Sequence, residues 1–328
     1  MGNPATDAAR AIAAEGWVYG YPLLENYRTM YPEAVDADDP RSVGGFGRFR
    51  HGSEPAAPAG ADGVPPDGDA PYSRAWLDLR AEPWVVSVPA VDRYYVLPVH
   101  DLDTSYVGFV GTRTTGSQPG DHLIAGPGWT GEPPEGLAGV LRADSDLAGI
   151  IARTHLVGPD DAPTLRAIQE QYQLRPLSTF LGAPAPEPAP EPVWPVWRED
   201  ALDSAEFFRY LDFLLGFFPV LPAEAALRER LDDLGVDGSG GFEPGDLIPE
   251  VREAIEQGIA DARDRLDRAS AEATDSSGWF GTRVQQGDDY LTRAVGVYNG
   301  PYALPVEEAR YEAGAAASEG TRRSGARG

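Results

Sequence analysis

Cysteine is absent from the 328 residues of the chain, and histidine occurs only four times. Disulfides, thiolate nucleophiles and sites in which cysteine binds zinc or an iron–sulfur cluster are therefore excluded. Any chemistry must rest on oxygen and nitrogen groups. With so few histidines, each one is a candidate for proton transfer or metal binding.

Lysine is absent as well. All 27 basic residues are arginine, and 52 acidic residues give a net charge of −25. Such a surface repels phosphate backbones and anionic membranes, so neither nucleic acid nor a membrane is expected as a partner. Acidic surfaces suit a salt-rich cytoplasm, because salt screens the self-repulsion. We expect either a halophilic source or a high-GC soil organism, and the salt dependence of unfolding separates the two.

Long apolar runs are missing too. Residues 213–220 form the longest run, which is far shorter than the roughly 20 residues of a membrane helix. Residues 1–17 have neither the basic nor the apolar region of a secretory signal, so a cytoplasmic location is the default prediction. Hydrophobic residues make up 42% of the chain, which predicts a packed globular protein with room for two packing units.

Hydrophobic spacing changes twice along the chain. Residues 6–30 have helical spacing, although Gly20 and Pro22 are expected to break or kink that helix. Seven short β segments then follow between residues 72 and 157 without intervening helices, which predicts an antiparallel sandwich or barrel. A helix over 161–174 is expected to precede the end of this unit.

Proline and glutamate alternate with alanine over residues 183–192, which is typical of a polyproline spacer. Helical periodicity follows it. The predicted fold class is α+β: an N-terminal helix plus an antiparallel β-sandwich, followed by a mainly helical region. The predicted organisation is a helix-plus-sandwich domain over 1–182, a Pro-rich linker over 183–200, a helical linker region over 201–311 and a disordered tail over 312–328.

Short motifs occur in a distinctive order from one end of the chain to the other. They include Trp17 to Arg28, Asp69, Tyr72 to Leu79, Glu82-Pro83, Val88-Pro89, Asp92 to Tyr95, Gly111-Thr112-Arg113, Gly126 to Trp129, Arg153-Thr154, Pro176-Leu177, Asp289-Tyr290-Leu291, Arg293-Ala294 and Tyr311. This order resembles the DUF1254 family, the N-terminal part of proteins that usually continue into a DUF1214 region. The resemblance covers roughly residues 11–311 and implies a mixed helical and β-sandwich fold. Because the activity of that family is mostly unassigned, it implies no reaction.

Two departures from the family pattern affect the interpretation. Residues 67–70 read Asp-Gly-Asp-Ala, whereas the family typically has Asn-Asn-Asp-Thr, so two amides and one hydroxyl are lost as ligand contacts. The second β region of the family is expected just after Tyr311, but alanine, glycine and arginine follow instead. We therefore expect a truncated chain, either a genuine short form or a frameshift, with exposed apolar surface on the helices after Ser204.

One candidate site is the segment from His100 to Asp103. An imidazole next to carboxylates is able to orient a general base or bind a divalent metal. In a strand, however, His100 points away from Asp101 and Asp103. The alternative is a strand-end histidine with solvated acids. We take His100, Asp103 and Asp69 as the catalytic candidates.

A second set of residues offers a grip for a polar ligand. Tyr72, Arg74, Arg93 and Arg113 provide a phenol and guanidinium groups, which bind carboxylates and other acceptors. Structural ion pairs with neighbouring aspartates explain the same residues equally well.

Two functional hypotheses follow. The favoured one is a soluble binding or assembly module, because half of the family architecture is not found in this chain. The alternative is an enzyme of undetermined type, such as a hydrolase, with a polar pocket in the sandwich near Asp69, Tyr72, Arg93, His100 and Asp103. No metal site is predicted and the cofactor is unknown. A homo-oligomer and a small polar ligand remain open as partners.

Overall fold

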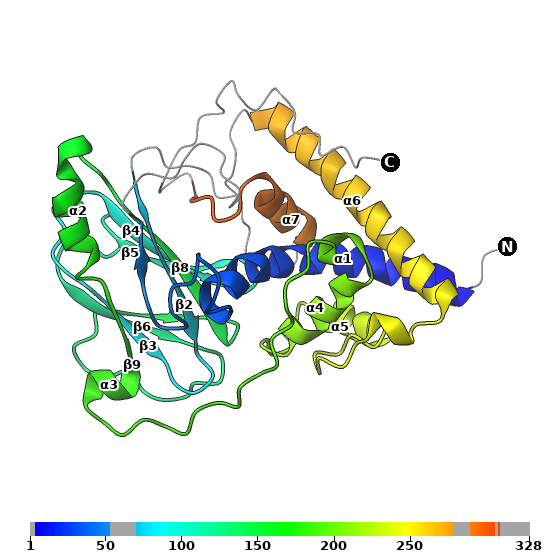
Figure 1. The fold of residues 1–328 in the computed structure, drawn as a ribbon, viewed down its shortest axis with the longest axis horizontal. Helices are drawn as coiled ribbons and strands as arrows, with labels where there is room; N and C mark the ends of the chain where they lie inside the picture. Colours follow the sequence, from blue (N-terminus) through cyan, green and yellow to red (C-terminus); the bar gives the residue numbers. More distant parts are fainter. Residues whose placement is uncertain (1–3, 53–69, 278–288, 306–307, 309–328) are drawn as a thin grey trace.

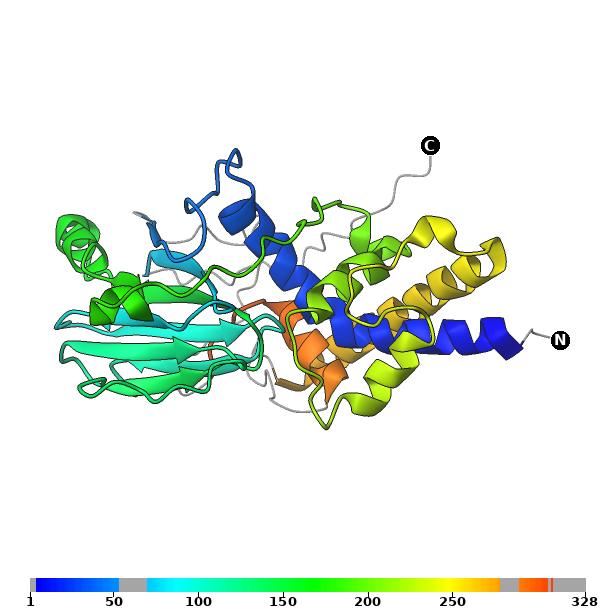
Figure 2. The same ribbon diagram turned by 90° about the horizontal axis from the view of Figure 1, so that it is seen from below.

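The computed structural model describes residues 4–52, 70–277, 289–305 and 308. A β-sandwich forms one part of the molecule, and a group of helices forms the other (Figures 1 and 2). The long helix α1 (Pro4–Met30) runs from the helical part to the sandwich. The predicted α+β class, with a helix, then sheets, then further helices, is confirmed.

The sandwich contains two sheets. One has the order β1-β2-β8-β4-β5 and the other the order β7-β6-β3-β9. The strands are β1 (Arg50–His51), β2 (Tyr72–Asp78), β3 (Trp84–Val88), β4 (Tyr95–Asp101), β5 (Tyr106–Gly111), β6 (Gly120–Ala125), β7 (Gly139–Arg142), β8 (Leu147–Thr154) and β9 (Gln173–Pro176).

Each of the seven predicted β segments contains a strand of the structure. All pairs are antiparallel except β6 with β7, which is parallel. Their inward side chains form a closed apolar core that includes Leu77, Val86, Leu97, Ile124 and Ile150. Sequence periodicity missed β1 and β9 because two and four residues are too few to show an alternation.

The helical part combines α1 with elements that follow the sandwich. A π-helical turn, Tyr31–Val35, extends α1. The other helices are α2 (Ala162–Gln169), α3 (Leu177–Leu181), α4 (Glu206–Leu215), α5 (Ala225–Asp232), α6 (Pro249–Ser277) and α7 (Tyr290–Asn299), with 3₁₀ turns at Pro159–Asp161, Ala201–Asp203 and Pro244–Asp246.

Helix α1 continues through Gly20 and Pro22, so of the two expected effects, a break or a kink, the break is not observed. Proline inside a helix removes one hydrogen bond at a cost of about 3 kcal/mol. Packing offsets that cost, because α1 is buried from Gly16 to Leu24 against α4, α5, α6 and α7. Gly20 permits this approach: a Cβ there would lie 2.9 Å from the side chain of Leu211 in α4.

The apolar faces of the helices after Ser204 are covered. Phe207, Leu211, Leu214, Leu227 and Ile259 are all buried in the core that α1 shares with α4, α5 and α6. Large exposed apolar side chains in this part of the described chain are limited to Val220, Ile248 and Tyr298, which lie in three different segments. The expected exposed apolar surface is therefore not observed on the described helices.

Residues 183–198 contain neither helix nor strand, as the proline pattern predicts. They are nevertheless attached to both parts of the molecule. Arg80 of the sandwich donates to the carbonyl of Pro190 at 2.7 Å, and Tyr27 of α1 donates to the carbonyl of Pro195 at 2.6 Å. Trp194 stacks on Phe217, with ring centroids 5.7 Å apart. The segment therefore runs along both parts of the molecule.

The closest approach between α1 and α6 gives a test of this packing. A Cβ on Gly258 would lie 2.4 Å from the backbone carbonyl oxygen of Arg10. We expect Gly258→Ala to lower the free energy of unfolding by about 1–3 kcal/mol through overpacking, although alanine favours a helix by about 1 kcal/mol. Urea unfolding measures the change. Gly245→Ala, which adds a methyl group in open space, is the control, and equal stability of the two variants would contradict the packing.

Candidate functional site

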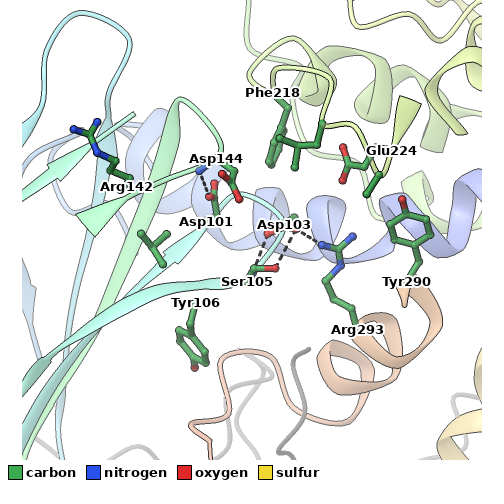
Figure 3. A pocket seen from close by; sticks show the side chains of 13 residues that line it. Asp101, Asp103, Ser105, Tyr106, Arg142, Asp144, Phe218, Glu224, Tyr290 and Arg293 are labelled. Atoms are coloured by element: carbon green, nitrogen blue, oxygen red, sulfur yellow. Dashed lines mark hydrogen bonds and ion pairs between the residues drawn. The ribbon is translucent and has the colours of Figure 1, made fainter. Parts of the chain in front are cut away.

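A pocket of about 220 Å³ lies where the sandwich meets the helical part. The end of β4 with the turn after it, the β7–β8 turn, residues 218–224 and α7 surround it (Figure 3). Val107, Phe218, Leu221 and Ala223 form apolar walls. The charged side chains that line it are Asp101, Asp103, Arg142, Asp144, Glu224 and Arg293.

Asp101 ends β4 and is 3% exposed. Its carboxylate accepts hydrogen bonds from the backbone N–H groups of Leu102 at 2.9 Å, Asp144 at 2.6 Å and Ser145 at 3.1 Å, and from the Ser145 hydroxyl. Burial, followed by the charge of Asp103, raises the pKa of Asp101 to about 7, although the hydrogen-bond donors around the carboxylate oppose this rise. The contacts make Asp101 the group that holds the β7–β8 turn against the end of β4.

Asp103 lies in the tight turn between β4 and β5. Its two oxygens accept from the backbone N–H of Ser105 at 2.9 Å and from the Ser105 hydroxyl at 3.1 Å. Thr104 has a φ of 71°, in the left-handed region that non-glycine residues seldom adopt. This conformation turns the chain back after β4, and Asp103 then reaches the helical part.

Arg293 of α7 forms an ion pair with Asp103 across 190 residues of sequence. The side chain of Arg293 is 4% exposed, and that of Asp103 is 14% exposed. Nε and Nη2 of Arg293 are buried and have no hydrogen-bond partner among the described residues. A buried guanidinium thus faces the pocket with only one of its nitrogens paired within the described part of the chain.

Two further acids complete the site. Glu224 precedes α5, is 8% exposed and accepts from the Tyr19 hydroxyl of α1 at 3.1 Å. Burial raises the pKa of Glu224, and the Tyr19 hydrogen bond and Arg293 partly reverse that rise. Asp144 is exposed, and partial burial, followed by the charge of Asp103, raises the pKa of its carboxyl. The pocket therefore concentrates negative charge around Arg293.

Helix α1 lies behind the pocket and touches both of its sides (Figure 3). Asn26 donates to the carbonyl oxygens of Asp101 at 3.1 Å and Leu102 at 2.8 Å, and Tyr19 holds Glu224. The sandwich side and the helical side are thus positioned by one helix.

His100 does not line this pocket. Its ring is completely buried, edge-on to Trp76 at 5.3 Å and 4.7 Å from the ring of Tyr302. A Cβ on Gly149 of β8 would lie 2.3 Å from the imidazole, so glycine is needed opposite the ring. Burial lowers the pKa of His100 to about 4. The strand alternation that separates His100 from Asp101 is the one expected from the sequence.

The predicted ligand-binding residues lie elsewhere. Arg93 precedes β4 and Asp103 follows it, so this seven-residue strand separates them by roughly 20 Å. Tyr72 pairs with Arg153, which also faces Val96 near the start of β4. Arg113 follows β5 at that same end of the sheet.

These residues already have structural contacts. Arg93 pairs with Asp92 at 3.1 Å and with Asp161, and Arg74 pairs with Glu33 at 2.6 Å. Arg113 is exposed and lies over the ring of Tyr94.

Asp69 lies outside the described residues. The structure therefore brings Asp103 together with Asp101, and not with His100, Tyr72, Arg93 or Arg113. The functional roles assigned to these residues from the sequence stay predictions.

Sequence reasoning missed Asp144, Glu224 and Arg293 as site residues. Arg293 is among the residues that carry the family resemblance. This was the one sequence feature that distinguished Arg293 from the other arginines. Glu224 and Asp144 lie in segments whose acidic residues look like ordinary solvated charges. Only their positions in the folded chain distinguish them.

No group of three histidine or acidic side chains within the described ranges is arranged to hold a metal ion. Among the helices of those ranges, none is both long and apolar enough to cross a membrane.

Residues 46–176, which contain all nine strands of the described structure, match the family model described as "Protein of unknown function (DUF1254)". We call residues 46–176 the DUF1254 region, after this match. The DUF1254 region supplies Asp101, Asp103, Arg142 and Asp144, whereas Glu224 and Arg293 come from the helical part beyond the match.

Solved structures extend the comparison beyond the DUF1254 region. The crystal structure of the VPA0106 protein from Vibrio parahaemolyticus is similar, with a TM-score of 0.70 and 25% identity over 91% of this chain and 69% of the Vibrio chain. An uncharacterized protein from Burkholderia cenocepacia matches with a TM-score of 0.32 and 14% identity over 86% of this chain and 58% of its own, which is too low to support an argument. No curated protein matches the chain.

The burial of His100 predicts a pH dependence of stability. An unfolded histidine has a pKa of about 6.5, and the folded value is about 4, so between these values the unfolded chain binds a proton that the native chain excludes. The free energy of unfolding should therefore decrease as the pH falls through this range. We expect His100→Gln to remove up to about 3 kcal/mol of that decrease.

Urea unfolding at several pH values, compared between the wild type and His100→Gln, measures the effect of this side chain. The two stability curves should diverge toward neutral pH, with the wild type gaining more. Parallel curves would show that His100 is accessible to protons in the folded protein.

Proposed function

We propose that the protein is a binding module for a small polar molecule, which occupies the pocket between the DUF1254 region and α7. The observation that carries this proposal is the convergence of four carboxyl groups and the guanidinium of Arg293, from four segments of the chain, around one pocket of about 220 Å³. Ion pairs that serve stability alone need no shared cavity. Pockets with a few convergent polar groups and perturbed pKa values are the usual binding sites of proteins.

The pocket size limits the ligand. Its volume of about 220 Å³ is below the roughly 300–1,000 Å³ of pockets that hold drug-sized molecules. Apolar walls next to charged groups favour a ligand with a short apolar part and a polar part. Phosphate-rich ligands fit poorly, because four carboxyl groups surround the guanidinium of Arg293, while that of Arg142 is directed to Trp129.

An acid–base hydrolase is the alternative. Two nearby carboxyl groups with different pKa values are the arrangement that such enzymes use, and the raised pKa of Asp101 beside Asp103 supports this alternative. Against it, both oxygens of Asp101 already accept hydrogen bonds from the neighbouring turn. A carboxyl group held in this way is better suited to fix the pocket than to transfer protons, so binding is the better supported function.

Filling the pocket tests the proposal. Ala223 lines the pocket and is exposed, so Ala223→Phe should block the space without removing a charged group. We expect a thermal-shift screen of small polar metabolites to find ligands that raise the Tm of the wild type, and that Ala223→Phe loses the shift. Ala226→Phe, at an exposed position of α5 outside the pocket lining, should retain it.

Ligands that stabilise the wild type and Ala223→Phe equally would place binding elsewhere. A screen without any stabilising compound would contradict a small-molecule function for this pocket.

A further inference from the structure

Arg293 has buried hydrogen-bond donors that the described residues leave unpaired. It is 3% exposed, and one nitrogen of its guanidinium pairs with Asp103. Nε and Nη2 are buried and have no hydrogen-bond partner among the described residues. Buried donors left without acceptors are costly, and the planar guanidinium matches the two oxygens of a carboxylate. The ligand should therefore present a carboxylate to Arg293.

On the other side of the pocket, the carboxylate of Asp144 favours a positively charged group of the ligand. Asp144 is exposed, and no hydrogen bond or ion pair of its carboxylate is found within the described part of the chain. The backbone N–H of Asp144 donates to the carboxylate of Asp101 at 2.6 Å. This hydrogen bond fixes the backbone from which the Asp144 side chain extends. Figure 3 shows Asp144 and Arg293 on different sides of the pocket, with Phe218 and Glu224 above it.

The charge balance agrees with a ligand that carries both signs. Asp101, Asp103, Asp144 and Glu224 line the pocket together with Arg293. The guanidinium of Arg142 points away from them and lies over the ring of Trp129, so acidic groups outnumber basic ones around the pocket. A simple anion would be repelled by the excess of carboxylates, and a simple cation would leave Arg293 without its acceptor. An ammonium group bound to Asp144 and a carboxylate bound to Arg293 satisfy both requirements.

We propose that the pocket binds a compact zwitterion of the amino-acid type, with its carboxylate on Arg293, its ammonium on Asp144 and a short apolar side chain against Phe218 and Leu221. This inference rests on the proposed function and adds the chemical class of the ligand. The small volume and the apolar walls match an aliphatic side chain rather than a large or charged one.

Isothermal titration calorimetry with a matched series of probes tests the inference. L-valine carries both charged groups, isobutylamine lacks the carboxylate, 3-methylbutanoate lacks the ammonium, and D-glucose is a neutral polar control. We expect L-valine to bind, and each single-charge analogue to bind at least about tenfold more weakly, because each loses a charge-assisted hydrogen bond.

Two variants test where the ammonium and the carboxylate of the ligand bind. Asp144→Asn should weaken L-valine at least about tenfold and leave 3-methylbutanoate unchanged, whereas Asp160→Asn, at an exposed acid of the α2 region, should change neither. Arg293→Lys keeps the positive charge beside Asp103 but loses the planar fork, so it should weaken L-valine and 3-methylbutanoate and leave isobutylamine unchanged.

The failures are distinguishable. Binding of D-glucose with no binding of L-valine would overturn the zwitterion and leave the small-molecule function intact. Binding of L-valine that is insensitive to Asp144→Asn would overturn the assigned position of the ammonium. No binding of any of the four probes would overturn the ligand class, and the proposed function itself would fail only if the pocket-dependent thermal shift were absent too.

Discussion

The burial of α1 is the constraint on which the rest of the structure depends. This helix packs against α4, α5, α6 and α7, and its hydrogen bonds from Asn26 reach the end of β4. Small residues make the packing possible: Gly20 admits α4, and Gly258 of α6 admits the backbone of α1. Because apolar helix faces must be covered by another layer, α1 is what joins the helices that follow the sandwich into one core. The relative position of the sandwich and α7 follows from it.

That position creates the pocket. Asp103 and Arg293 are 190 residues apart in sequence and form one buried ion pair, and Tyr19 of α1 holds Glu224 beside them. Buried ion pairs contribute little net stability, because desolvation offsets the attraction between the charges. A buried ion pair beside a cavity, with further guanidinium nitrogens left unpaired by the described residues, fits a binding role better than a purely structural one.

Local patterns in the sequence predicted the fold well and the site poorly. Strand alternation identified seven of the nine strands found in the described residues, and helical periodicity identified α1 and α4 to α6. Helix α1 continues through Pro22, where a break or a kink was expected, because long-range packing outweighs a local propensity. Among the candidate site residues, alternation correctly separated His100 from Asp101, but nothing local could bring Asp103 to Arg293 or Glu224. The proximity of Asp103, Glu224 and Arg293 depends on tertiary packing. The hydrophobic pattern of a helix does not show which of its polar residues will line a pocket.

If the pocket between Asp144 and Arg293 holds a small zwitterion, the ligand should be visible there. The most direct measurement is a crystal structure of the protein grown in saturating L-valine. We expect density in the pocket with a carboxylate on the guanidinium of Arg293 and an amino group on Asp144. A pocket filled by protein side chains, or one in which Arg293 contacts only water at saturating L-valine, would contradict this proposal.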